Sequence, residues 1–266
     1  MIIIGELINS TREEIKEIVA ERDEEKVKEI AKKQEEAGAD YIDVNAGTFV
    51  EDEPGHLSWL VKTVSEVVEV PLSLDSPRTE ALEVAFELTG GECMLNSITA
   101  EEDRYSGLLP LVQENEGGVI ALCMDDDGMP ESVEERLTIA EKLMNRLLAD
   151  GVGEDRIYLD PLVKPVSVDG SNGIQVVETV RGIKKWGSDV HITCGLSNVS
   201  YGLPARALLN RVFLMFLMSA GLDSAILNPL DKELMDLIKA ARVLLNRDAY
   251  GAEFLQAVRS GEIGRD

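Results

Sequence analysis

Short apolar runs recur along this chain, and a polar side chain follows most of them. The residues at or just after the ends of the runs are Glu6, Asn9, Asp43, Asn45, Asp75, Asn96, Ser97, Met124, Asp125, Asp160, Ser197, Asn198 and Asn228. An aspartate can accept two N–H hydrogen bonds from a guanidine-like edge, and an asparagine supplies one donor and one acceptor group. If these side chains converge, they could bind a flat heterocycle with alternating donors and acceptors.

The same positions hold no lysine and no histidine, which argues against several other chemistries. A Schiff-base aldolase needs a lysine in its site, and a metal-dependent hydrolase needs clustered histidines and carboxylates. The chain has only two histidines, His56 and His191, so we expect no intrinsic metal. A sugar-phosphate barrel enzyme would carry a glycine-rich loop where this chain has Asn228-Pro229-Leu230-Asp231. A 2-amino-4-oxo pterin fits the residue types better.

Each of these residues also has a structural interpretation. Asp43 and Asn45 could serve a turn or a helix cap. Asp75-Ser76-Pro77 and Asp160-Pro161 also resemble turns, because a proline restricts the residue before it. The shared position of these residues at the ends of apolar runs favours the functional interpretation. For the acidic run 125–127 we favour a solvated loop over a cation site.

The apolar runs have the length and the β-branched content of buried strands. They are residues 2–5, 41–44, 71–74, 93–95, 119–123, 157–159, 191–195 and 224–227. Helical patterns separate these eight runs, and the alternation predicts a parallel sheet. We expect a single α/β domain over residues 1–266, a (β/α)8 TIM barrel with its site at the carboxyl ends of the strands. An open doubly wound sheet would show a glycine-rich turn after its first strand, and Gly5-Glu6-Leu7-Ile8-Asn9 is not one.

Composition limits the partners and the location. With 26 Lys and Arg against 50 Asp and Glu, the formal charge is −24, which disfavours nucleic acid and anionic membranes as partners. The longest apolar stretch, 212–218, is too short to span a bilayer. The N-terminal residues do not resemble a signal peptide. The three cysteines, Cys93, Cys123 and Cys194, are read as buried reduced thiols of a cytoplasmic protein.

Six segments resemble one known family over nearly the whole chain. They are IIIGELIN at 2–9, ADYIDVNAG at 39–47, PLSLDS at 71–76, MLNSI at 94–98, YLDPLV at 158–163 and GLSNVS at 195–200, the last followed by Arg206 and Asn210. With these segments the chain resembles the methyltetrahydrofolate:corrinoid protein methyltransferases of the pterin-binding superfamily. Tyr201 departs from close relatives, which can carry a polar residue such as glutamine in this loop.

The resemblance implies a role for each matching residue. Asp75, Asn96 and Asp160 would bind the pterin edge, and Asn198 would lie near N5, the atom that carries the methyl group. Arg206 would lie against the pterin, and Ser197 and Met124 would line the pocket. Glu6, Asn9, Asp43 and Asn45 are further candidates at the mouth. The implied substrates are tetrahydrofolate or 5-methyltetrahydrofolate and a corrinoid (cobalamin) held by a partner protein, with transfer in either direction.

Two alternatives stay open at this point. A dihydropteroate synthase-like pterin enzyme would need basic residues for a pterin pyrophosphate, and the lysine-rich signature of that synthase near strand seven is missing. A non-catalytic folate-binding module would bind the pterin without turnover.

Residues 207–220, ALLNRVFLMFLMSA, are apolar around most of a helix. The outer helix of a barrel needs only one apolar stripe. We therefore expect a homodimer with this helix in or beside its interface, a quaternary structure that the resemblance also implies. The alternative is that Asn210 and Arg211 mark the only exposed strip.

Overall fold

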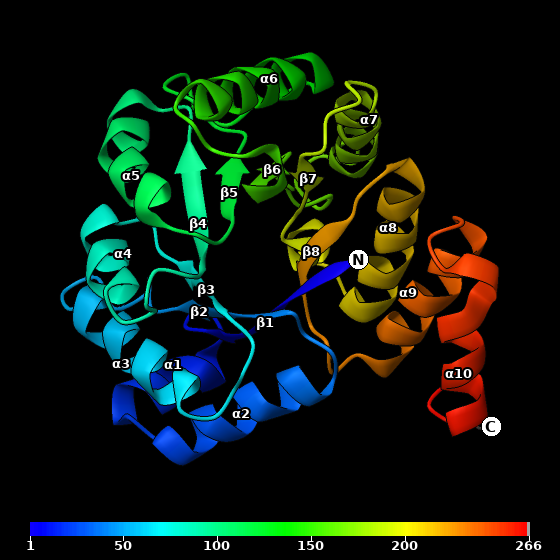
Figure 1. Ribbon diagram of the computed structural model, residues 1–266, viewed down its shortest axis with the longest axis horizontal. Coiled ribbons are helices and arrows are strands. Elements are labelled where there is room, and N and C mark those ends of the chain that lie inside the picture. Colours follow the sequence, from blue (N-terminus) through cyan, green and yellow to red (C-terminus); the bar gives the residue numbers. More distant parts are fainter. Residues whose placement is uncertain (265–266) are drawn as a thin grey trace.

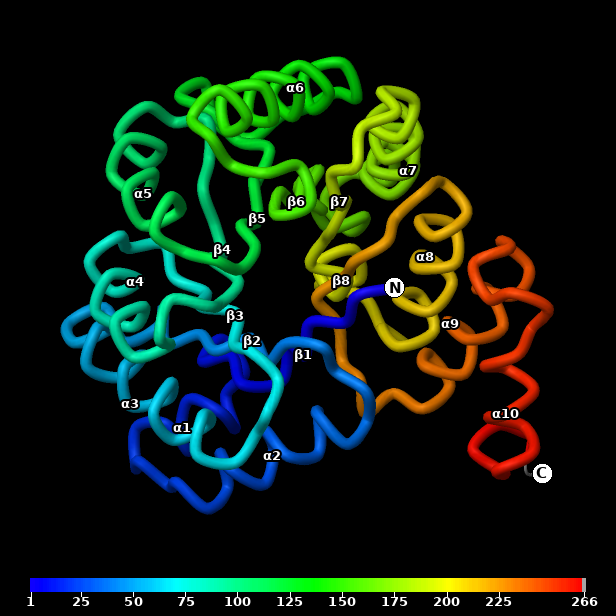
Figure 2. Tube along the Cα trace, in the orientation of Figure 1, coloured from blue at the N-terminus to red at the C-terminus, as the bar shows by residue number. Residues whose placement is uncertain are grey.

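The computed structural model describes residues 1–264, in which eight strands alternate with helices (Figure 1). The strands are β1 Ile2–Asn9, β2 Tyr41–Asn45, β3 Leu72–Asp75, β4 Met94–Thr99, β5 Val119–Leu122, β6 Ile157–Asp160, β7 His191–Ile192 and β8 Ser224–Leu227. From β1 to β7 each strand pairs in parallel with the next one in sequence, and β8 pairs in parallel with β1. Figure 2 shows the chain circling the barrel once, from the blue helices near the N-terminus to the orange and red helices near the C-terminus.

The barrel closes between β7 and β8 with little backbone pairing. The amide of Ile226 donates to the carbonyl of Cys194 at 2.9 Å, and Gly195 forms an isolated parallel bridge with Ile226. The amide of Ile192 donates to the Asp223 carboxylate at 2.8 Å. The predicted (β/α)8 barrel is confirmed, and the open doubly wound sheet is wrong.

The helices form an outer ring around the strands (Figure 1). They are α1 Glu13–Glu21, α2 Glu24–Glu36, α3 Glu53–Ser65, α4 Thr79–Phe86, α5 Glu102–Glu114, α6 Val133–Ala149, α7 Asn172–Lys184, α8 Arg206–Ala220, α9 Lys232–Leu244 and α10 Ala252–Ser260, with short 3-10 helices η1 Glu154–Arg156, η2 Leu196–Ser200 and η3 Ala249–Gly251. Side-chain caps begin several of them: Asp23 accepts from the amide of Lys26, and Ser132 from that of Glu135. Gly151 follows α6 with a φ of 89°, which glycine adopts without strain.

Two inward-facing layers place the polar residues at one end of the barrel. The lower layer is a buried apolar cluster of Ile4, Met94, Ile120 and Tyr158, packed against Tyr41. Side chains two residues apart on a strand face the same side. The next inward-facing residues on these five strands are therefore Glu6, Asp43, Asn96, Leu122 and Asp160, and all five line the cavity above the cluster. The apolar layer closes the barrel below the site.

Some predicted boundaries were wrong. Strand β1 continues to Asn9, so Glu6 and Asn9 lie inside the strand and not after it. Strand β7 ends at Ile192 and not at Gly195, because the chain turns into η2 at Leu196. The three cysteines are buried and free, as expected. Within residues 1–264, no helix combines the length and the apolarity that crossing a bilayer requires.

Candidate functional site

A cavity of about 1150 Å³ opens at the carboxyl ends of the strands. All eleven predicted site residues line it: Glu6, Asn9, Asp43, Asn45, Asp75, Asn96, Met124, Asp160, Ser197, Asn198 and Arg206. They come from β1, β2, β3, β4 and β6, from the loop after β5, and from η2 and the start of α8. Residues up to 200 positions apart in sequence therefore meet in one concave site.

Three neighbouring strands supply a hydrogen-bonded floor. Strand register sets Asn45 beside Asp75, and Asp75 beside Asn96. The Asn45 Nδ2 donates to Asp75 Oδ2 at 2.9 Å. On the deeper level, Ser73 Oγ donates to Asp43 Oδ1 at 2.7 Å, and Asn96 Nδ2 approaches the same oxygen at 3.4 Å. The carboxylates are thereby oriented while some of their acceptor capacity remains for a ligand.

Burial raises the pKa of three aspartates that line the cavity, Asp43 and Asp75 in this floor and Asp160 on β6. The Asp43 pKa lies well above its usual range, because of burial and then the nearby Asp75 charge. Burial raises the pKa of Asp75 to about 6 and that of Asp160 to about 7. The hydrogen bond from Asn45 to Asp75 and the amides of Leu162 and Gly195 at Asp160 act in the opposite direction without cancelling the shift. N–H donors of a ligand would stabilise the charged forms of these carboxyls.

The wall formed by η2 is held from two directions. Ser197 Oγ donates to the Glu6 carboxylate, at 2.8 Å from each oxygen. Arg206 Nη2 donates to the Ser197 carbonyl at 2.8 Å, and Arg206 Nε donates to Ser200 Oγ at 3.2 Å. Asn198 is exposed to the cavity, and its side chain makes no hydrogen bond to any residue from 1 to 264. Its carboxamide is therefore free to meet a ligand.

Two arginines of the cavity wall were missed by the sequence analysis. Arg104 reaches across from α5 and donates to the carbonyls of Ser76, Pro77 and Ser97 at 2.8 Å each. It fastens the loop after β3 to strand β4. Arg12 approaches Glu6 at 3.6 Å. Neither arginine follows an apolar run, and only a three-dimensional arrangement brings them to the mouth.

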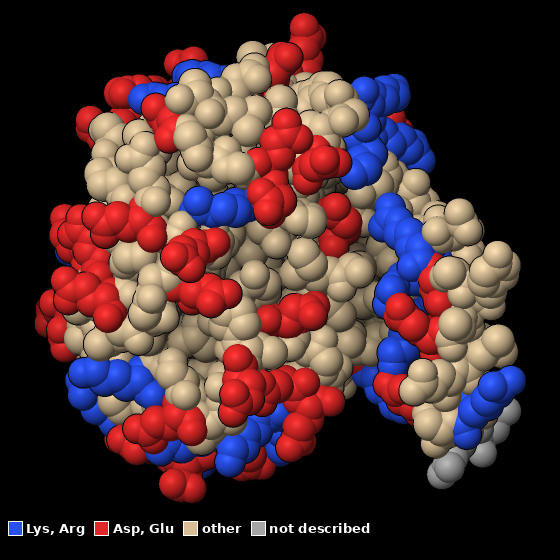
Figure 3. All heavy atoms as spheres, in the orientation of Figure 1, with Lys and Arg blue, Asp and Glu red and all other residues tan. Residues whose placement is uncertain are grey.

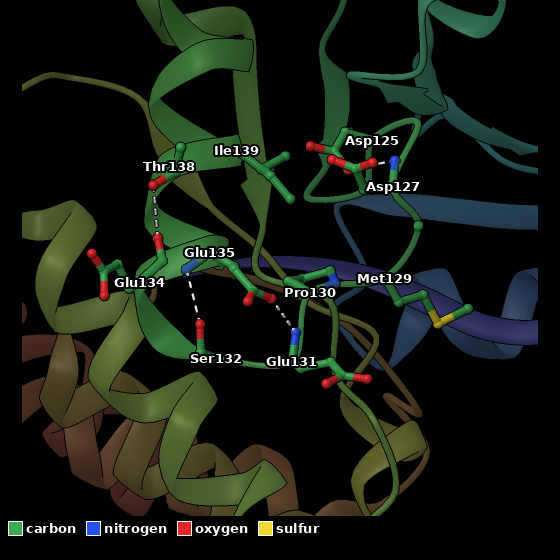
Figure 4. A pocket seen from close by; sticks show the side chains of 11 residues that line it. Asp125, Asp127, Met129, Pro130, Glu131, Ser132, Glu134, Glu135, Thr138 and Ile139 are labelled. Carbon is green, nitrogen blue, oxygen red and sulfur yellow. Dashed lines mark hydrogen bonds between the residues drawn. The ribbon is translucent and has the colours of Figure 1, made fainter.

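Two residues expected at the mouth lie elsewhere. Asn228 does not line the cavity, because its side chain accepts from the amide of Leu230 at 2.9 Å and forms a turn. Asp125 lines a second hollow of about 600 Å³ beside the loop between β5 and α6 (Figure 4). There its carboxylate accepts from the amide of Asp127 at 3.1 Å. Both residues have the turn chemistry that competes with a functional interpretation.

The second hollow is acidic, and one of its carboxylates, that of Glu135, bonds to the backbone at the start of α6. Figure 4 shows Ser132 bonded to the amide of Glu135, and the Glu135 side chain bonded to the amide of Glu131, at 3.1 and 2.7 Å. These reciprocal contacts satisfy backbone donors at the helix start. Within residues 1–264 no group of three His, Cys, Asp or Glu residues is placed to hold a metal ion.

The sequence of the chain is similar to those of several known proteins. Residues 5–228 match the family model of pterin binding enzymes. The chain is 36% identical to the methylcorrinoid:tetrahydrofolate methyltransferase of Eubacterium limosum, over 99% of this chain and 98% of that protein. It is 33% identical to methionine synthase of Mycobacterium tuberculosis, over 86% of this chain and 20% of that longer protein.

Solved structures share the fold at lower identity. Dihydropteroate synthase from Xanthomonas albilineans in complex with 7,8-dihydropteroate superimposes with a TM-score of 0.70 at 17% identity, over 93% of this chain and 94% of that one. A likeness at this level of identity shows the common barrel and does not assign an activity.

Proposed function

The chain belongs to the pterin-binding enzyme family, and from this premise we propose that it is a methyltransferase acting between N5 of tetrahydrofolate and the cobalt of a corrinoid. The observation that carries the proposal is the full-length identity of 36% to a methylcorrinoid:tetrahydrofolate methyltransferase, combined with a polar cavity at the barrel mouth that is large enough for a pterin. The name of that relative gives methylcorrinoid as the donor, and we propose the same direction here. A partner protein holds the corrinoid and docks over the mouth.

Each proposed contact follows from the donor and acceptor groups of the cavity. Asp75, Asn96 and Asp160 bind the edge of the pterin, where buried carboxylates accept from its N–H groups. Asn198 reaches N5, and Arg206 lies against the pterin ring. Met124 and Ser197 complete the wall, and Glu6, Asn9, Asp43 and Asn45 shape the rest of the mouth. The protein binds and orients the pterin, and the corrinoid supplies the metal chemistry.

A transfer assay with free methylcobalamin tests the function without the partner. Mixed with tetrahydrofolate, the protein should consume methylcobalamin and produce 5-methyltetrahydrofolate. Binding of tetrahydrofolate without turnover would indicate a folate-binding module. Condensation of a pterin pyrophosphate with p-aminobenzoate would indicate a synthase.

We propose further that the protein is cytoplasmic and forms a homodimer. Residues 1–266 would form one pterin-binding domain, which would hold no metal of its own. The free buried thiols of Cys93, Cys123 and Cys194 support a reducing compartment. Elemental analysis of the purified protein should find no stoichiometric metal.

The second face of α8 supports self-association. Leu208, Leu209, Val212 and Phe216 are 59, 37, 46 and 57% exposed, so this apolar face is not packed within the barrel shell. Residues 206–266 contain eight basic and eight acidic residues, and the whole formal charge of −24 therefore lies on residues 1–205. In Figure 3, basic side chains run along the side of α8 and α9, where acidic ones lie beside them, whereas acidic side chains predominate over much of the rest of this view. Two copies meet here with the least charge repulsion.

Light scattering behind a size-exclusion column tests the dimer. We expect twice the chain mass of 29.1 kDa for the wild type and the single mass for Phe216→Glu, because a buried unpaired carboxylate disrupts an apolar interface. Val84→Glu on α4, 45% exposed and across the barrel from α8 (Figure 1), is the matched control and should remain dimeric. A wild-type mass near 29.1 kDa would contradict the proposal.

A further inference from the structure

Glu6 is a cavity carboxylate that the proposed pterin contacts do not use. Asp75 and Asp160 are assigned to the pterin edge, and Asp43 is held below by Ser73. Glu6 lies on β1, and its side chain is 15% exposed. Its hydrogen-bond partner is the hydroxyl of Ser197, the residue directly before Asn198. Glu6 is thus coupled to the segment that the proposed function places beside N5.

The methyl transfer needs a proton acceptor at that place. When tetrahydrofolate accepts the methyl group, N5 uses its lone pair to form the new N5–carbon bond. The cobalt–carbon bond breaks with its electron pair left on the metal, which is reduced by two electrons. N5 then carries both a methyl group and its original hydrogen, and this hydrogen must leave as a proton. Asn198 can donate or accept a hydrogen bond at N5, but a carboxamide cannot take up the proton.

The hydrogen-bond chain around Glu6 can hold a proton without losing a contact. Asn210 Nδ2 lies 3.4 Å from Ser197 Oγ, and Ser197 Oγ donates to Glu6. Asn210 Oδ1 is buried and has no hydrogen-bond partner within residues 1–264. If Glu6 is protonated, it can donate to Ser197 Oγ, and the Ser197 hydroxyl can turn to Asn210 Oδ1 after rotation of that amide. Asn210 Oδ1 would therefore accept a hydrogen bond when Glu6 is protonated.

We propose that Glu6, acting through the hydroxyl of Ser197, accepts the proton that leaves N5 during methyl transfer to tetrahydrofolate. The N5–H bond breaks, the proton passes to Ser197 Oγ, and the hydroxyl proton of Ser197 passes to a Glu6 oxygen. In the reverse direction, Glu6 returns the proton to N5 as the methyl group departs. This inference rests on the proposed function of the site.

The charges that face Glu6 set the pH range of this step. Burial raises the Glu6 pKa, while the Ser197 hydroxyl and the cations Arg12 and Arg206 lower it. Arg12 lies at the start of α1, and Arg206 at the start of α8. Asp43 on β2 is a nearby carboxylate, and the negative charges of Asp43 and Glu6 repel each other. Glu6 must be ionised to accept the proton, so transfer to tetrahydrofolate should increase as pH rises through the Glu6 pKa.

Transfer from free methylcobalamin to tetrahydrofolate tests the proposal at saturating tetrahydrofolate. Glu6→Gln should lower the rate about 10²-fold or more, the usual effect of losing a general acid–base group. The dissociation constant for tetrahydrofolate should change less than about threefold, under 1 kcal/mol. The transfer rate of Glu6→Gln should not show the increase with pH that ionisation of Glu6 causes in the wild type. Ser197→Ala should show the same rate loss, and Ser197→Thr, which keeps the hydroxyl, should recover most of the rate.

Asp150→Asn is the matched control, because Asp150 also accepts a hydroxyl hydrogen bond, from Tyr105 at 2.7 Å, outside the cavity. It should transfer at the wild-type rate. A Glu6→Gln enzyme with wild-type rate and pH dependence would overturn the proposal. So would a rate loss matched by an equal loss of tetrahydrofolate affinity, which would make Glu6 a pterin contact, or a fully active Ser197→Ala enzyme. If wild-type protein transfers no methyl group, the proposed function itself has failed.

Discussion

Replacement of Asn198 by alanine is expected to slow methyl transfer about 10²–10³-fold, the effect of removing one well-placed donor from a transition state. N5 gains or loses charge as the methyl group moves, and a carboxamide can follow that change as donor or as acceptor. In the unliganded protein the Asn198 side chain has no hydrogen-bond partner within residues 1–264. The interaction with N5 is therefore made only with the substrate and can be strongest in the transition state.

The affinity for tetrahydrofolate separates this role from simple binding. Asn198→Ala should change the dissociation constant by much less than the rate, as measured by calorimetric titration beside single-turnover kinetics. Asn228→Ala is the matched control, because Asn228 is also a carboxamide at the end of a barrel strand but does not line the cavity. A wild-type rate in Asn198→Ala would remove Asn198 from the reaction.

Replacement of Asp160 by alanine is expected to weaken tetrahydrofolate binding by about 1–3 kcal/mol, or about 5- to 150-fold, because pterin donors would be left unpaired. Asp75→Ala should have a similar effect, since Asp75 faces the same cavity. Calorimetric titration measures both. If both variants bind as tightly as wild type, the pterin does not occupy this part of the cavity.

The pH dependence of binding gives a second test of the same residues. The pKa values of about 7 for Asp160 and about 6 for Asp75 lie above the ordinary aspartate value of 3.8. Folded-state pKa values raised in this way mean that the unliganded protein loses stability as pH rises from about 4 towards 7. Pterin N–H groups stabilise the ionised carboxylates. Affinity should therefore increase as pH rises through this range, and the thermal shift caused by tetrahydrofolate should be larger at pH 8 than at pH 5.5.

The sequence predicted those parts of the site that depend on strand position. Glu6, Asp43 and Asp160 each lie two residues beyond a lower-layer residue on the same strand, so the period of a strand puts them at the mouth. Their positions could be read from local patterns because a parallel barrel gathers the carboxyl ends of its strands.

The other features of the site depend on contacts between distant parts of the chain, which local sequence patterns do not encode. Arg104 reaches the cavity from a helix and binds carbonyls of the loop after β3 and of strand β4. Asp125 and Asn228 have the right type and spacing, but each closes a local turn. Strand β7 is short because the chain bends into η2. That bend carries Ser197 towards Glu6, 191 residues away in sequence.

The most direct test of the account is the fate of the methyl carbon. Methylcobalamin labelled with ¹³C in its methyl group would be incubated with tetrahydrofolate and the protein, and the products followed by NMR. We expect the label to appear on N5 of tetrahydrofolate in amounts equal to the methylcobalamin consumed, and both changes to be slowed by Asn198→Ala. Labelled carbon that stays on cobalt in the presence of bound tetrahydrofolate would contradict the assignment of this protein as a methyltransferase.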